Sequence, residues 1–109
     1  MIEKVLGKID FAEYGTFEDR PFLMGLQLGF KMQTCGVMSG AIYTVNMSDE
    51  CLWDSAEERE QTITKYVDKV YEILQQAGVN YVSELKNIPV EITLENNTFK
   101  DFRILTEVL

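Results

Sequence analysis

The stretch "FLMGLQLGFKM", from Phe22 to Met32, decides the fold of this chain. Every second residue in it is large and apolar, which predicts a β-strand with one face buried in a core. The buried face would carry Phe22, Met24, Leu26, Leu28, Phe30 and Met32, and the other face Leu23, Gly25, Gln27, Gly29 and Lys31. Because it contains two glycines, we expect that second face to be flat.

Strands are predicted on both sides of this stretch. A short turn through Gln33–Gly36 leads to a strand over Val37–Val45, and the shortness of the turn indicates antiparallel pairing. Before it, Val5, Gly7, Ile9 and Phe11 alternate with Leu6, Lys8, Asp10 and Ala12. This alternation predicts a half-buried strand that is followed by a polar connection over Glu13–Pro21.

A single long amphipathic helix follows the third strand. Asp54 or Ser55 is expected as its N-cap, Ser55 and Glu58 have capping-box spacing, and Gly78 is expected to end it. Helical periodicity places Ile63, Tyr66, Val67, Val70, Tyr71 and Leu74 on one face. The charged residues of the opposite face are typical of a solvated surface.

The C-terminal part reads as a hairpin. Apolar and polar residues alternate in "PVEITLE", which predicts a strand, and Asn96-Asn97 suits the positive φ of a two-residue turn. "TFKDFRILTEVL" is then predicted as the returning strand, with Phe102 and Ile104 as core residues. "YVSELKN" before Pro89 is typical of a helical turn or loop. The sequence therefore predicts one α+β domain over residues 1–109, with an antiparallel sheet of about five strands in the order β-β-β-α-β-β and the helix on one face.

Composition and charge exclude several classes of protein. The chain has 109 residues with 46% hydrophobic and 26% charged, as in an ordinary globular domain. Glu3, Lys4 and Lys8 interrupt the N-terminus, so no signal peptide is expected, and two cysteines suit a reducing cytoplasm. A net charge of −8 argues against direct nucleic-acid or membrane binding. The acidity is explained either by binding to a basic protein partner or by the need for solubility alone.

The residues needed for common catalytic chemistry are missing. There is no histidine, so a cysteine triad, imidazole acid–base catalysis and histidine-based zinc sites are excluded, and Cys35 beside Gly36 is interpreted as a turn residue. No phosphate-binding glycine motif occurs. Ser48–Glu50 with Asp54 forms the densest acidic cluster but lacks the spacing of a calcium loop. We therefore expect no enzyme activity, no cofactor and no metal.

Candidate binding residues lie on the flat strand face and around it. Glycines at Gly25 and Gly29 beside Gln27 indicate close approach by another subunit, a ligand or a facing aromatic ring of the same chain. Stacking surfaces are offered by Trp53, Tyr14, Phe17 and Tyr43, although core or loop packing is the favoured explanation for each of them. Arg20 and Arg103 are candidates to clasp a phosphate or carboxylate, and Asp49, Glu50 and Asp54 to contact a basic partner. A homodimer is expected through the flat face or a strand edge.

Two long stretches resemble short phage and prophage proteins. They are "YGTFEDRPFLMGLQLGFKMQTCGVMSG" (Tyr14–Gly40) and "LKNIPVEITLENNTFKDFRILTEVL" (Leu85–Leu109), and "CLWD" resembles the Trp-led helix start of that group. In those proteins Trp-Gly-Val stands where this chain has Cys35-Gly-Val, and they end in a "RILTEVL"-like strand. The resemblance implies phage origin but no particular activity.

The leading hypothesis is a non-enzymatic counter-defence factor in the host cytoplasm. It would inhibit a host immune effector, such as a CRISPR nuclease, or sequester an immune signalling nucleotide. The alternatives are an accessory protein of phage DNA replication or recombination, and a small enzyme that uses Asp and Glu alone. Acidity favours the protein partner, whereas the glycine-rich face and the two arginines favour the nucleotide.

Overall fold

The computed structural model describes residues 1–32, 36–48 and 53–109, with the backbone alone for 37–42. Within these residues, five strands form one antiparallel sheet: β1 (Ile2–Thr16), β2 (Leu23–Met32), β3 (Gly36–Asn46), β4 (Pro89–Glu95) and β5 (Thr98–Ile104). The helix α1 (Ala56–Ala77) follows β3, and 3₁₀ turns span Val82–Leu85 and Thr106–Val108. The predicted α+β order of three strands, a helix and two strands is confirmed.

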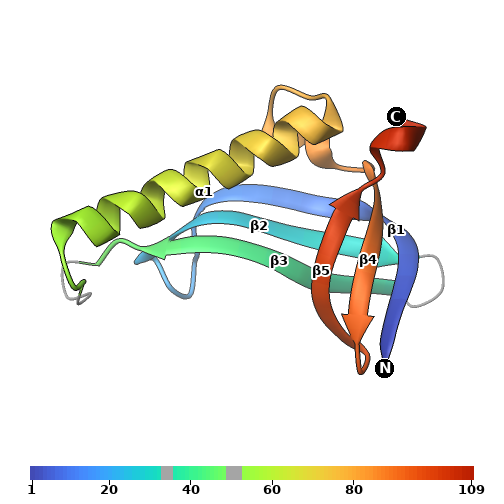
Figure 1. The fold of residues 1–109 in the computed structure, drawn as a ribbon, viewed down its shortest axis with the longest axis horizontal. Helices are drawn as coiled ribbons and strands as arrows, with labels where there is room; N and C mark the ends of the chain where they lie inside the picture. The colour runs from blue at the N-terminus through green and yellow to red at the C-terminus, as the bar shows by residue number, and fades with distance from the viewer. Residues whose placement is uncertain (33–35, 49–52) are drawn as a thin grey trace.

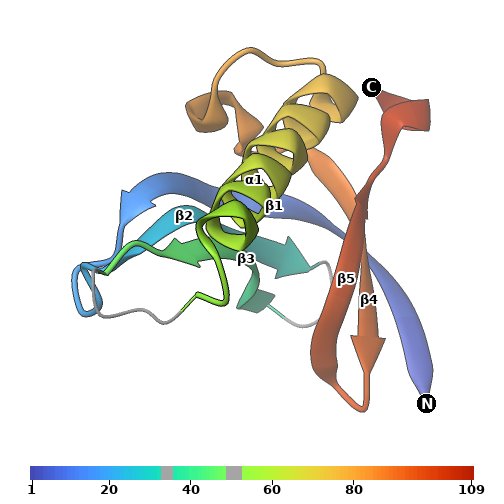
Figure 2. The same cartoon turned by 60° about the vertical axis from the view of Figure 1, so that its left-hand side comes forward.

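The strand order is β3-β2-β1-β4-β5, so β1 lies in the middle of the sheet and β3 and β5 lie at its edges. Figures 1 and 2 show α1 lying along one face of β1, β2 and β3, while the β4–β5 hairpin crosses the end of that layer. The sheet curls so strongly that β5 approaches β3. This curl encloses the core between the helix and both halves of the sheet.

The core is centred on Phe30, which is fully buried. Its ring stacks on Phe99 with centroids 5.4 Å apart and contacts Phe102 at 5.1 Å, so residues of β2 and β5 meet across the curl. Leu26 and Leu28 of β2 are also fully buried, as the alternation predicts. Ile73 and Ala77 cover this layer from α1.

The helix begins and ends where the sequence predicts. Ser55 is the N-cap, and its Oγ accepts a hydrogen bond from the Glu58 backbone N–H at 3.0 Å. Gly78 takes the left-handed conformation, with φ at 70°, just after Ala77. Both ends are thus satisfied by local hydrogen bonds, which fix the helix length before any packing is considered.

The C-terminal hairpin turns through Asn96 and Asn97, whose φ angles of 53° and 65° confirm the predicted turn. Phe102 and Ile104 contact the core, also as predicted. The prediction that the strand continues through "RILTEVL" is wrong, because β5 ends at Ile104 and a 3₁₀ turn follows.

The prediction for β1 is wrong in two respects. The strand runs on through Thr16, so half of the expected polar connection is paired with β2. A register shift between Ile9 and Phe11 then turns Phe11 to the face opposite Ile9, while Ala12 packs against the core. A bulge of this kind adds one residue and reverses the alternation beyond it.

The apolar run of β2 also begins later than predicted. Phe22 lies outside the strand and is 44% exposed, and Met24 is 39% exposed although it occupies a core-facing position. Met24 lines a small cavity beside Ile63 and Val67 of α1, so the helix does not pack closely on it.

Candidate functional site

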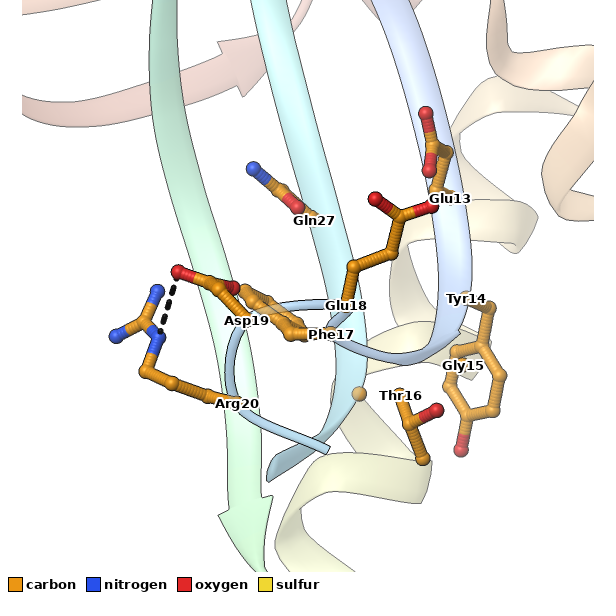
Figure 3. Close-up of a pocket in the computed structure, with 10 residues that line it drawn as sticks. Glu13, Tyr14, Gly15, Thr16, Phe17, Glu18, Asp19, Arg20 and Gln27 are labelled. Carbon is orange, nitrogen blue, oxygen red and sulfur yellow. Dashed lines mark ion pairs between the residues drawn. The ribbon is translucent and has the colours of Figure 1, made fainter. Parts of the chain in front are cut away.

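A polar cavity of about 370 Å³ lies at the turn between β1 and β2. Figure 3 shows it on the face of the sheet away from α1. The end of β1, the turn after it and two residues of β2 form its lining: Glu13, Tyr14, Gly15, Thr16, Phe17, Glu18, Asp19, Arg20, Gly25 and Gln27. The structure thus brings together five of the residues that the sequence nominates, namely Tyr14, Phe17, Arg20, Gly25 and Gln27.

Backbone hydrogen bonds hold the turn that closes this cavity. The Arg20 N–H donates to the Phe17 carbonyl at 3.3 Å, and the Leu23 N–H donates to the Arg20 carbonyl at 3.0 Å. The Phe17 N–H in turn donates to the Leu23 carbonyl at 3.4 Å. These bonds place the Phe17, Asp19 and Arg20 side chains beside Gln27 of β2 (Figure 3).

The charge of the cavity is predominantly negative. Glu13, Glu18 and Asp19 contribute carboxylates, and Arg20 contributes the one guanidinium of the lining. The Arg20 Nε lies 3.5 Å from an Asp19 carboxylate oxygen, and its guanidinium carbon lies 5.4 Å from the Phe17 ring centroid. The pair is well exposed and contributes about 1 kcal/mol or less to folding. The ion pair nevertheless engages the Arg20 guanidinium, which is the only positive charge of the cavity lining. The remaining carboxylates make the cavity suited to a cation.

The two glycines of β2 are explained by the chain itself. A Cβ at Gly29 would collide with the Phe11 ring, and a Cβ at Gly25 would collide with the Tyr43 carbonyl oxygen of β3. Of the three explanations that the sequence left open, the facing aromatic ring applies at Gly29. At Gly25 the neighbouring strand comes close instead.

Tyr43 lies on the helix side of the sheet, away from the polar cavity. Burial, with smaller effects of Asp101 and Glu72, raises its pKa to about 12. The Lys69 Nζ lies 5.6 Å from the Tyr43 ring centroid. With residues of α1, Tyr43 lines a second cavity of about 610 Å³, which lies between the helix and β3.

Trp53 and Asp54 lie at the start of α1. Trp53 is half-buried, and among the described residues its indole N–H has no hydrogen-bond acceptor although the nitrogen is buried. Asp54 is exposed, and its backbone N–H donates to the Glu58 carboxylate at 2.8 Å. Four residues discussed from the sequence lie outside the described residues: Cys35, Asp49, Glu50 and Cys51.

Arg103 lies on β5 and lines neither cavity. Its guanidinium pairs with Glu107 at 3.1 Å and with Glu91 at 3.7 Å. The hydrogen bond to Glu107, with the charges of Glu107 and Glu91, raises the pKa of Arg103. Both candidate arginines are therefore engaged by carboxylates of the chain, in separate clusters.

Sequence reasoning missed the acidic residues of the cavity. Glu13, Glu18 and Asp19 fall in the segment that was interpreted as a plain connection. The available signal was three acids within seven residues beside Phe17 and Arg20. Only the continuation of β1 through Thr16 reveals that Glu13 and Glu18 face the same cavity.

No protein-family model matches the chain, and comparison with curated proteins and with solved structures gives no match either. No helix in the described part of the chain has the apolar length needed to cross a membrane.

Proposed function

We propose that this chain is a small phage-encoded binding protein without catalytic activity, a counter-defence factor that inhibits a host immune effector by occupying a basic surface. The observation that carries the proposal is the excess of carboxylates in the cavity at the β1–β2 turn. The net charge of −8 acts in the same direction over longer distances. The resemblance to phage proteins over Tyr14–Gly40 and Leu85–Leu109 supports the phage origin.

The cavity suits a lysine or arginine side chain of the partner. Glu13, Glu18 and Asp19 supply acceptors for an ammonium or guanidinium group, and the Phe17 ring offers a face to a cation. The stacking of Arg20 on Phe17 is an example of that contact within the chain. A partner bound through such pairs dissociates readily as the salt concentration rises.

Sequestration of a nucleotide is less well supported. A phosphate needs a free guanidinium, and both Arg20 and Arg103 are paired with carboxylates. The carboxylates that surround Arg20 would also repel a phosphate. For this reason the protein partner is the mode that we propose.

The test is a pull-down from infected host cells with partners identified by mass spectrometry, followed by a phage-plating assay. We expect Glu13→Gln/Glu18→Gln to weaken both partner recovery and phage protection. The control Glu3→Gln/Glu60→Gln removes the same charge from exposed positions outside the cavity and should retain both.

Two arginine variants separate the binding modes. Arg103→Ala should leave activity unchanged, and Arg20→Ala should retain it because Asp19 is released to the partner. Removal of a guanidinium that contacts a buried phosphate costs about 2–5 kcal/mol, enough to abolish micromolar binding. Loss of activity in folded arginine variants, with the acidic variant still active, would refute the proposal in favour of nucleotide sequestration.

A further inference from the structure

The edge of the sheet at β3 has an open side. In the sheet order β3 has one neighbour, β2, among the described strands. Figure 1 shows β5 crossing the first part of β3, while the last part of β3 lies beneath the first half of α1. An edge strand of this kind presents unpaired backbone groups to any extended chain that comes alongside.

The hydrogen bonds show which backbone groups face outward. The Met47 N–H donates to the Phe22 carbonyl at 2.7 Å, and beyond this pair the register continues with Leu23 opposite Asn46 and Gly25 opposite Thr44. Hydrogen-bonded and non-hydrogen-bonded pairs alternate along antiparallel strands. Thr44 and Asn46 therefore direct their N–H and C=O groups away from β2, to the open side.

A groove runs beside this edge. The cavity of about 610 Å³ between α1 and β3 has Tyr43 on the strand side and Thr62, Lys65, Tyr66, Asp68, Lys69 and Glu72 on the helix side. The Tyr43 and Tyr66 rings offer apolar surface within it. In a strand added to β3, every second side chain would face the helix side, as Tyr43 does. An added strand would thus place alternate side chains in this groove.

We infer that the open edge of β3 and the groove beneath α1 bind an extended segment of the basic partner, which adds to the sheet as a sixth strand. The inference rests on the proposed function for the class of partner. The backbone of Thr44 and Asn46 would supply the hydrogen bonds, and apolar side chains at alternate positions would fill the groove. Lysine or arginine between them suits the net charge of −8. The same charge opposes a second copy of this chain at that edge.

The test uses a synthetic heptapeptide of alternating lysine and valine, with a heptapeptide of the same composition and three adjacent valines as the control. We expect the alternating peptide to slow amide exchange at Thr44 and Asn46 about tenfold, with Tyr43 and Val45 little changed because their amides already bond to β2. Thr44→Pro removes an outward N–H and should weaken binding about tenfold. Thr44→Val keeps that N–H and should bind normally.

Three outcomes would overturn the inference. They are equal binding of both peptides, equal binding to the two Thr44 variants, and protection of Thr44 that rises with protein concentration when no peptide is present. The last would assign the edge to a homodimer. If Thr44→Pro does not fold, amide exchange in the unmodified protein decides the question alone. Because the cavity carboxylates take no part in this readout, failure here leaves the proposed function standing. Failure of the proposed function is detected separately, by the carboxylate variants in the pull-down and phage-plating assays.

Discussion

Replacing Gly29 with alanine tests whether this glycine serves the chain's own packing or an external ligand. The new methyl group would occupy the position of the Phe11 ring edge, with the ring Cζ only 2.7 Å away. Two further ring atoms, Cε1 and Cδ1, would be closer still, and ordinary carbon contacts need roughly 3.5–4.0 Å, so the ring must move by about 1.5–2 Å or leave the sheet. Overpacking of this size costs about 1–3 kcal/mol, and we expect about 2 kcal/mol for Gly29→Ala.

The measurement is urea unfolding of four proteins: wild type, Gly29→Ala, Phe11→Ala and the double variant. In a thermal melt of the same proteins, a loss of about 2 kcal/mol should lower the melting temperature by about 10 °C. Because the collision needs both residues, the double variant should be more stable than the sum of the single losses predicts, by about 1 kcal/mol or more. Unchanged stability of Gly29→Ala together with lost partner binding would refute the packing explanation and assign the glycine to a ligand.

Three further predictions concern single residues. Ser55→Ala removes the acceptor for the Glu58 N–H and should lower the free energy of unfolding by about 1 kcal/mol in urea titrations, whereas Ser55→Asp should retain most of it. Burial first, then Asp101 and Glu72, raise the pKa of Tyr43 from 10.0 to about 12, so its folded state holds the proton more tightly than the unfolded state. This contribution to the free energy of unfolding is fully present below pH 10 and is lost as the pH rises towards 12. After allowance for solvent screening, the loss should be about 1–2 kcal/mol. Tyr43→Phe should abolish this part of the pH dependence of unfolding. Cys35→Ser should retain the fold and phage protection at a cost of about 1 kcal/mol or less, and complete loss of protection in the folded variant would contradict its role as a turn residue.

Much of the fold follows from local sequence signals. The alternation from Leu26 to Met32 in β2, the Ser55 and Gly78 caps and the Asn96-Asn97 turn each act within a few residues, and the structure agrees with all of them. The bulge in β1 could not be found this way, because apolar Phe11 and small Ala12 suit either face of a strand. The choice is made by Gly29, whose missing side chain leaves room for the Phe11 ring on the far face.

The candidate site was predicted only in part. Arg20, Gly25 and Gln27 meet in one cavity, but their charged neighbours Glu13 and Glu18 depend on where β1 ends. Arg103 was grouped with Arg20 by residue type alone, whereas the curl of the sheet determines its surroundings. Ion pairing with Glu91 and Glu107 depends on cross-strand register and on the final 3₁₀ turn. Neither can be read from spacing in the sequence.

The central position of β1 has a consequence for the order in which the chain folds. Lys8 pairs with Pro89 and Ile2 pairs with Glu95, so β1 is synthesised well before the hairpin that it pairs with. The β1–β2–β3 meander needs only short loop closures, whereas the β1–β4 ladder joins opposite ends of the chain. Contacts so distant in sequence form slowly. Until Pro89 and the residues after it are synthesised, the edge of β1 that pairs with β4 is unpaired. During that time aggregation with other chains through this edge competes with folding of the β4–β5 hairpin onto β1.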